Sequence, residues 1–309
     1  MSAETLICLV RHGVTDWNYE GRAQGRTDVP LNREGIQQAE AVAERLAREE
    51  WHAIYSSPLK RAFSTAEAIA RRIGLPVQPE PGLMERNLTV AEGSTELDRR
   101  IRWPGKQLRE IPGVETDAEM AVRAHRTLEA IARRHPGERV ICVSHGGLMK
   151  VFLESVLARD GEHPRLGTPG NTAVASVGFN GERFRVIALP DTSHLLVNGI
   201  EFSGESWRAR RNLKELAALS GLSPEMWDTI ILRSSAVECA WQGDRLVAFA
   251  RMFTDGVVAG YVDLVLAEPG YTHLIPVLLK RLQDRFPDVT VTRLPEPPLG
   301  PSRLRRSLP

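Results

Sequence analysis

Short apolar runs alternate with longer amphipathic segments over the first 195 residues. The runs at 5–10, 51–58 and 139–145 are too short for helices and are typical of strands. The runs at 5–10 and 139–145 are typical of strands that are buried on both faces of a sheet. Apolar residues recur at helical spacing in the segments between them, which predicts helices over 33–50, 59–74, 117–135 and 146–160. Strands that alternate with helices predict an α/β fold, with a mostly parallel sheet flanked by helices.

Local signals place the ends of these helices. Ser57 is expected to cap the helix over 59–74, with Pro58 at its first position, and Gly74 to end it. Asp117 is expected to cap the helix over 117–135. The core face of the first helix is expected to carry Ile36, Ala39, Ala43, Leu46 and Ala47. Residues 172–190 predict a hairpin that turns at Asn180-Gly181.

The pattern changes beyond residue 200. Residues 206–236 read as helical, 237–271 as three antiparallel strands, 272–287 as a helix and 289–294 as a last strand. The Pro- and Arg-rich tail is expected to fray. We therefore expect two domains, an α/β domain over 1–200 and a smaller α+β domain over 201–309, in keeping with a length of 309 residues.

Composition narrows the function classes. The chain is 42% apolar and 26% charged, which is ordinary for a globular protein, and its net charge of +1 gives no reason to expect nucleic acid as a partner. No apolar run approaches the length of a membrane span, and no signal segment is expected. The three cysteines lie in strand-like stretches without metal-site spacing, which indicates buried, reduced thiols and a cytoplasmic location.

Two of the predicted strands end in the same dipeptide, His12-Gly13 and His145-Gly146. Ligands of parallel sheets bind at the carboxyl edge, so the two histidines can share one site if their strands are neighbours. A helix begins after His145, and its free N–H groups attract anions. Arg11 adds a permanent positive charge there, and Arg61, in the first turn of its helix, can reach the same edge.

These groups describe a pocket for a phosphoryl group. A neutral imidazole is a nucleophile toward phosphorus, and fixed positive groups stabilise the transferring phosphoryl, so the chemistry needs no metal and no cofactor. A general acid must protonate the leaving oxygen. Glu85 is the first candidate for this acid and Glu92 the second. The alternatives are that the histidines only cap their turns and that Glu85 is a solvated loop carboxylate.

Five stretches in this order, "LVRHGVTDWN", "AQGRTDVPLNREG", "IYSSPLKRAFSTAEAIA", "LMERNLTVAEG" and "VICVSHGG", resemble the histidine phosphatase superfamily, which has the phosphoglycerate mutase-like fold. The likeness covers about residues 5–195. It implies that His12 accepts the phosphoryl group as phosphohistidine and that Glu85 donates the proton. It further implies that the phosphate is held by a set of surrounding residues: Arg11, Arg61, His145, Asn18, Gln24, Gly25 and the backbone of Gly146.

Departures from the family pattern refine the expected activity. "ERNLTVAEG" keeps both acids but lacks the family's aromatic residues, and the continuation typical of glycolytic mutases is absent. The resemblance therefore implies a phosphatase that hydrolyses small phosphorylated metabolites. A phosphoglycerate mutase, a phosphate-ligand sensor without activity and a bifunctional enzyme stay open as alternatives. "LPDTSHLL", with Asp191 and His194, is expected to form a structural cap.

The second domain resembles the later half of the GNAT acetyltransferase fold in "DRLVAFARMFTDG", "AGYVDLVLAEPGY" and the helix that follows. GNAT enzymes hold the pyrophosphate of acetyl-CoA on a glycine-bearing loop, and "PGYTHLIPVLLKRL" lacks its positive residue and its glycines. The likeness implies a degenerate domain with little or no acetyl transfer. We expect it to pack on the phosphatase, shape the mouth of its site or mediate a homodimer.

Overall fold

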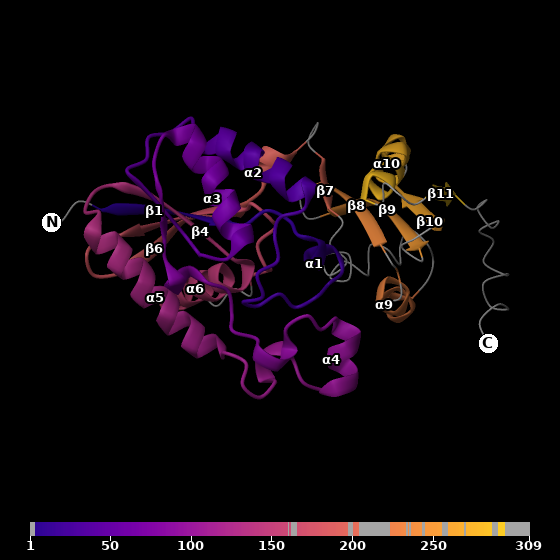
Figure 1. The fold of residues 1–309 in the computed structure, drawn as a ribbon, viewed down its shortest axis with the longest axis horizontal. Helices are drawn as coiled ribbons and strands as arrows, with labels where there is room; N and C mark the ends of the chain where they lie inside the picture. Colours follow the sequence, from indigo (N-terminus) through magenta and orange to yellow (C-terminus); the bar gives the residue numbers. More distant parts are fainter. Residues whose placement is uncertain are drawn as a thin grey trace. The chain divides into compact units, whose positions relative to one another are not determined.

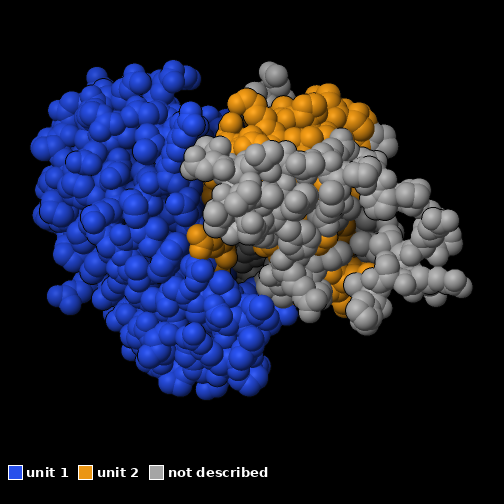
Figure 2. All heavy atoms as spheres, turned by 45° about the vertical axis from the view of Figure 1, so that its right-hand side comes forward, with its two compact units in different colours: residues 1–18, 22–195 blue, residues 19–21, 196–309 orange. Residues whose placement is uncertain are grey.

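The computed structural model divides the chain into two compact units (Figure 2). Unit 1 comprises residues 1–18 and 22–195, and unit 2 comprises residues 19–21 and 196–309. The described residues are 4–159, 161, 166–196, 200–203, 223–232, 234, 236–242, 245–254, 259–268, 270–285 and 290–293. The division of the chain into an α/β domain over residues 1–200 and a smaller α+β domain over residues 201–309 stays a prediction.

Unit 1 is built on a six-stranded sheet with the order β3-β2-β4-β1-β5-β6. Its strands are β1 (Thr5–Arg11), β2 (Ala53–Ser56), β3 (Val77–Pro79), β4 (Arg139–Ser144), β5 (Val174–Phe179) and β6 (Phe184–Asp191). The first four strands pair in parallel, whereas β5 pairs antiparallel with both β1 and β6. The predicted α/β fold and the β5–β6 hairpin are therefore confirmed, in a sheet that is mixed.

Helices cover both faces of this sheet (Figure 1). They are α2 (Arg33–Leu46), α3 (Lys60–Ile73), α5 (Asp117–Arg134) and α6 (Gly146–Arg159), whereas the short helix α1 (Asp16–Tyr19) follows β1 in the loop that leads to α2. Successive residues of a strand point to opposite faces, so Ile7 and Leu9 pack with α5 and α6 while Cys8 and Val10 pack with α2 and α3. Burial on both faces explains the continuous apolar runs of the central strands.

Two predicted features of α2 and α3 are wrong. Ile36 is 56% exposed and Ala47 is the exposed C-cap residue, because the buried stripe of α2 consists of Gly35, Ala39, Val42, Ala43 and Leu46. Ser57 does not cap α3, whose N-cap position is Leu59 with no side-chain bond, and Pro58 precedes the helix instead of being its first residue. The first helical N–H, that of Lys60, donates instead to Asp28 Oδ1 at 2.7 Å. A carboxylate from another loop thus replaces the local cap, and the prediction that Gly74 ends the helix is confirmed by its φ of 74°.

The cap of α5 is one residue earlier than predicted. Thr116 Oγ1 accepts from the N–H of Glu119, and the Glu119 carboxylate accepts from the N–H of Thr116. This reciprocal pair is a capping box, and it makes Asp117 the first helical residue instead of the cap. The helix then buries Met120, Ala124, Leu128 and Ile131 against the sheet.

The segment between β3 and α5 contains only short elements: η1 (Pro81–Leu83), η2 (Thr89–Ala91), α4 (Glu96–Arg102) and η3 (Leu108–Glu110). Leu88, Ala91, Ile111 and Val114 form a small buried cluster of its own. We call residues 80–116 the acid-bearing segment, since it contains both Glu85 and Glu92. No strand of the sheet runs through the acid-bearing segment, so the shape of this segment depends on side-chain contacts.

Unit 2 contains a five-stranded sheet with the order β11-β10-β9-β8-β7. Its elements are β7 (Glu201–Ser203), α9 (Pro224–Leu232), β8 (Ala236–Gln242), β9 (Arg245–Thr254), β10 (Ala259–Ala267), η5 (Thr272–Leu274), α10 (Ile275–Arg285) and β11 (Thr290–Arg293). Strands β8, β9 and β10 are antiparallel, as predicted, and β11 pairs in parallel with β10. The sequence reading did not include β7.

Several predictions for unit 2 lie outside the described residues: the helix over 206–222, the turns at 243–244 and 255–256, and the tail from 294. Within the described part of the chain, no helix has the length and apolar character that crossing a membrane requires.

Candidate active site

The two His-Gly turns lie side by side at the carboxyl edge of the unit 1 sheet. Strands β1 and β4 are parallel neighbours in a register that places Val10 opposite Val143 and Arg11 opposite Ser144. The next residues are therefore His12 and His145, and their ring centroids are 5.1 Å apart. The register of two strands is thus sufficient to bring together residues that are far apart in the sequence.

The hydrogen bonding of His12 defines which ring nitrogen is free to react. Its Nδ1 lies 2.7 Å from the carbonyl oxygen of Gly13. A carbonyl only accepts, so Nδ1 carries the proton and Nε2 keeps its lone pair. Burial, and then the positive charges of Arg61 and Arg11, hold the pKa of His12 well below its ordinary value. A neutral imidazole with an available Nε2 has the form that a nucleophile requires.

The backbone of His12 is fixed from the turn that precedes β5. Its carbonyl oxygen accepts from Asn171 Nδ2 at 3.0 Å and from the N–H of Thr172 at 3.2 Å. Thr172 has a φ of 55°, which a branched residue rarely adopts. This strained turn is stable because its surroundings hold it there, and it fixes the main chain of His12.

The "LPDTSHLL" stretch supports that turn. Asp191 forms a two-pronged ion pair with Arg45, whose Nη1 also lies 3.3 Å from His194 Nδ1. An arginine only donates, so His194 Nδ1 accepts and its Nε2 donates to Thr172 Oγ1 at 3.0 Å. Burial and the charge of Arg45 lower the pKa of His194 to about 4, which keeps the ring in this neutral form. These contacts agree with a structural role for Asp191 and His194.

Positive groups surround the two histidines. Arg11 is 4% exposed and Arg61 is fully buried. Arg61 Nη1 and Nη2 donate to the carbonyls of Thr27 and Gly25, and its Nε has no partner among the described residues. Burial lowers the pKa of Arg61 to about 10, against the opposing charge of Glu85. A guanidinium this deeply buried favours an anion beside it.

His145 presents a second buried nitrogen. Its Nε2 lies 2.8 Å from Ser57 Oγ, and its Nδ1 has no partner among the residues that the structure describes. Burial, and then the charges of Arg61 and Arg11, lower its pKa well below the ordinary value. The same charges that repel a proton from His145 would attract an oxyanion.

Of the remaining candidates, Gly146 begins α6, and Asn18 and Gln24 belong to the segment between β1 and α2. A Cβ on Gly146 would lie 3.1 Å from Arg11 Nε and 2.7 Å from Thr168 Cγ2, so the start of α6 approaches Arg11 closely only because residue 146 is glycine. Asn18 Oδ1 accepts from the N–H and the hydroxyl of Thr15 and so shapes the loop after β1. Gln24 is 9% exposed, and its Oε1 has no partner among the described residues.

The two candidate acids occupy different places. Glu85 Oε2 accepts from the N–H of Gly147 at 2.9 Å, and Oε1 accepts from the N–H of Arg86 at 2.8 Å. Its carboxylate therefore lies at the start of α6, two residues from His145. Glu92 instead accepts from the N–H of Arg26 and from Thr27 Oγ1, so both of its oxygens hold a loop. This placement favours Glu85 as the acid.

Sequence reasoning missed two residues of this region. Ser57, interpreted as a helix cap, contacts His145. The signal was present, because Ser57 directly follows β2, which pairs with β4 and so ends at the same edge. Arg123 of α5 was not singled out at all, although it contacts the segment that carries Glu85.

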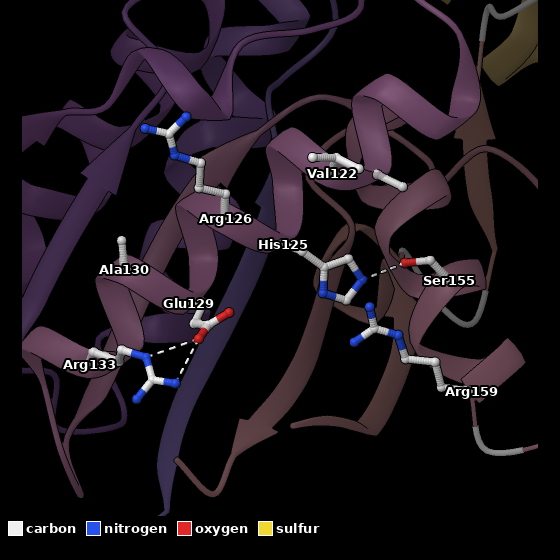
Figure 3. Close-up of a pocket in the computed structure, with 9 residues that line it drawn as sticks. Val122, His125, Arg126, Glu129, Ala130, Arg133, Ser155 and Arg159 are labelled. Atoms are coloured by element: carbon white, nitrogen blue, oxygen red, sulfur yellow. Dashed lines mark hydrogen bonds and ion pairs between the residues drawn. The ribbon is translucent and has the colours of Figure 1, made fainter. Parts of the chain in front are cut away.

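A separate pocket lies on the outer surface of α5 and α6 (Figure 3). It has a volume of about 610 Å³, and its lining includes His125, Arg126 and Arg159 but none of the candidate site residues. In the described part of the chain, no group of three or more His, Cys, Asp and Glu side chains is arranged to hold a metal ion.

Comparisons with known proteins match this part of the chain. The family model "Histidine phosphatase superfamily (branch 1)" matches residues 7–192. The phosphatase PhoE of Bacillus subtilis, itself uncharacterised, is 34% identical over 193 residues, covering 62% of this chain and 97% of that protein. A metal-independent phosphoserine phosphatase of Arabidopsis thaliana is 38% identical over 205 residues, covering 63% of this chain and 84% of that protein.

Solved structures give the same result. Phosphoserine phosphatase from Entamoeba histolytica, in complex with 3-phosphoglyceric acid, matches with a TM-score of 0.53 and 30% identity, over 62% of this chain and all of that chain. A phosphoglycerate mutase-like protein of Arabidopsis thaliana and a probable phosphoglycerate mutase of Yersinia pestis are also among the relatives. The enzyme class predicted from the sequence is confirmed, and the chain belongs to the histidine phosphatase superfamily, branch 1.

Proposed function

We propose that this protein is a metal-independent phosphatase that hydrolyses small phosphomonoesters through a phosphohistidine on His12. The observation that carries the proposal is the form of His12: a neutral ring, held by Gly13 through Nδ1, with Nε2 available beside buried positive groups. Two-step transfer through a covalent intermediate divides one difficult displacement into two easier ones.

In the first step, His12 Nε2 attacks phosphorus, the ester P–O bond breaks, and Glu85 gives its proton to the leaving alkoxide. In the second step, water attacks the phosphohistidine while the Glu85 carboxylate takes a proton from it. The N–P bond breaks, inorganic phosphate leaves, and His12 and protonated Glu85 are regenerated. Glu85 thus serves as acid and then as base, with no net change in the enzyme.

The surrounding groups stabilise the transferring phosphoryl. Arg11, Arg61 and His145 supply positive charge or N–H donors, and the N–H of Gly146 lies at the N-terminus of α6. Asn18 and the Gln24-Gly25 turn add polar groups at the edge. Because these groups are buried, their interactions with developing charge are stronger than they would be in water.

The substrate class that we propose is a small phosphorylated metabolite. Relatives are named for phosphoserine, and one related structure contains 3-phosphoglyceric acid, so both compounds belong in a test panel. A phosphoglycerate mutase stays the alternative, and it is distinguished by transfer of the phosphoryl group to a second acceptor instead of water. A phosphate-ligand sensor is distinguished by binding without turnover.

The test is phosphate release from a panel of phosphomonoesters with EDTA present, for wild type, His12→Ala and the control His125→Ala. His125 lines the outer pocket on α5 and is bonded to Ser155, and none of the candidate site residues lines that pocket (Figure 3). We expect turnover by wild type and by the control and none by His12→Ala, with all three folded. Turnover by folded His12→Ala, or none by wild type on any ester, would refute the proposal.

For unit 2 we propose a degenerate GNAT-like fold without acetyl transfer. The support is its topology: antiparallel strands β7 to β10, then α10, then β11 parallel to β10. Isothermal calorimetry with acetyl-CoA is the test, and we expect no binding heat; saturable binding would instead favour a bifunctional enzyme. A homodimer and a cytoplasmic location stay predictions.

A further inference from the structure

Four successive carbonyl groups of the acid-bearing segment are held by just two side chains. Arg123 Nη1 donates to the carbonyls of Gly82 at 2.9 Å and Met84 at 2.7 Å, and its Nη2 donates to that of Glu85 at 3.4 Å. Ser144 Oγ donates to the remaining carbonyl, that of Leu83, at 2.7 Å. The main chain that leads to Glu85 is therefore fixed residue by residue, although it has little regular structure.

All five N–H donors of Arg123 are used. Two go to the Glu115 carboxylate, from Nε and Nη2, both at 2.8 Å. The other three go to the carbonyls of the acid-bearing segment. Only an arginine offers five donors in one rigid plane, and a lysine offers three from a single point. Residue 123 therefore needs an arginine for its geometry as well as for its charge.

Glu115 fixes the arginine in turn. Its Oε2 also accepts from the N–H of Asn87, and both side chains of the Arg123–Glu115 pair are largely buried, at 19% and 12% exposure. Burial raises the pKa of Glu115, but the hydrogen bonds from Arg123 and Asn87 outweigh it, so the pKa lies below its usual value. Glu115 stays ionised, and a buried bidentate pair of this kind holds its geometry firmly.

The carboxyl group of Glu85 needs this support because the space between the acid-bearing segment and the start of α6 is narrow. A Cβ on Gly147 would lie 2.5 Å from Glu85 Oε1, and a Cβ on Gly82 would overlap Thr127 Oγ1 of α5. The segment thus lies tightly against α5 at one end and against the start of α6 at the other. A shift of about 1 Å in a reacting group is enough to cost about 10²-fold in rate.

We propose that Arg123 is a positioning residue for the proton donor, acting through the backbone of residues 82–85 and oriented by Glu115. The proposal rests on the proposed function, since it needs Glu85 to protonate the leaving group. Arg123 acts on the half of the reaction that concerns the leaving oxygen. It does not act on the groups that hold the phosphate.

Because Arg123 acts only on the half of the reaction that concerns the leaving oxygen, its loss should affect esters with different leaving groups differently. A purely structural role would not produce this difference. An alkyl phosphate needs protonation of its leaving oxygen, whereas the leaving group of p-nitrophenyl phosphate is stable as an anion. The ratio kcat/KM reports the transfer to His12 for both esters. Loss of acid placement therefore lowers kcat/KM for the alkyl ester and leaves that for the aryl ester nearly unchanged.

The experiment compares wild type, Arg123→Met, Arg123→Lys and Glu85→Gln on both esters. The matched control is Arg126→Met, an exposed arginine one turn further along α5 (Figure 3). For Arg123→Met and Glu85→Gln, we expect kcat/KM to fall about 10²-fold on the alkyl ester and little on the aryl ester. The kcat/KM of Arg123→Lys on the alkyl ester should lie between those of these two variants and that of wild type. The control Arg126→Met should have the kcat/KM of wild type on both esters. The double variant Arg123→Met/Glu85→Gln should be no slower than Glu85→Gln.

Circular dichroism establishes which variants are folded. If Arg123→Met does not fold, the proposal is tested with Arg123→Lys, which keeps the positive charge. An equal loss on both esters in a folded Arg123 variant, or no loss on either, overturns the proposal. Failure of the proposed function has a different signature: wild type then releases no phosphate, or Glu85→Gln loses activity equally on both esters.

Discussion

His12 and His145 follow neighbouring strands of a buried sheet, whereas Glu85 stands on a segment of short turns that the sheet does not reach. Backbone pairing between β1 and β4 sets the distance between the two histidines. The position of Glu85 depends on an arginine 38 residues later in the chain and on a serine at the end of β4. One half of the site is thus placed by main-chain register and the other half by side chains.

The difference has consequences for stability and for adaptation. A residue at the end of a central strand moves only if the sheet moves, so His12 and His145, which belong to the proposed phosphate-holding half, are held as firmly as β1 and β4. A segment held by side-chain bonds, each worth about 1 kcal/mol net, can take a new shape through few substitutions. Removing one partner of the buried Arg123–Glu115 pair would cost more, about 3–5 kcal/mol, because the other charge stays buried.

The same difference explains what the sequence could reveal. Apolar runs that end in His-Gly predicted two buried strands and a shared edge, and the structure places His12 and His145 there. Arg61 could be placed because the start of α3 follows β2 directly. Strand patterns and turn signals are local in the sequence, so they can be read without a structure.

The choice between Glu85 and Glu92 could not be settled that way. Both lie in one irregular stretch, and what separates them is the partner of each carboxylate, Gly147 for one and the 26–27 loop for the other. Those partners are about 60 residues away in the sequence, and no periodic pattern connects them. For the same reason the sequence predicts only a helix cap at Ser57, since the bond of Ser57 to His145 depends on the order of strands in the sheet.

The largest effect is expected on the phosphate-holding half. Arg61→Met removes a buried cation beside His12 and His145, and removal of one such group typically costs about 10²–10³-fold in kcat. We expect equal losses of kcat/KM on alkyl and aryl phosphates, because in the proposed mechanism Arg61 interacts with the phosphoryl group and not with the leaving oxygen. Arg72→Met, an exposed arginine on the same helix, is the control. Loss confined to the alkyl ester would contradict the division of the site into two halves.

A smaller effect should appear in proton uptake on anion binding. Burial, and then the charges of Arg61 and Arg11, hold the pKa of His145 well below its ordinary value, so we expect a neutral ring at about pH 6. The charges of Arg61 and Arg11 lower the pKa of the adjacent His12 as well, so a bound dianion raises the pKa of both rings, and the histidine pair takes up a proton. Sulfate is a suitable probe because it does not itself titrate in this range.

Calorimetry of sulfate binding at about pH 6, in buffers that differ in ionisation enthalpy, should therefore show net uptake of up to about one proton. Glu85→Gln should keep this uptake, since Glu85 belongs to the other half of the site. Arg61→Met should reduce it, because the free His145 then has a higher pKa and already carries part of its proton. If the proton uptake disappears in Glu85→Gln, the group that takes up the proton is Glu85 and not a histidine. The two halves of the site would then be electrostatically coupled.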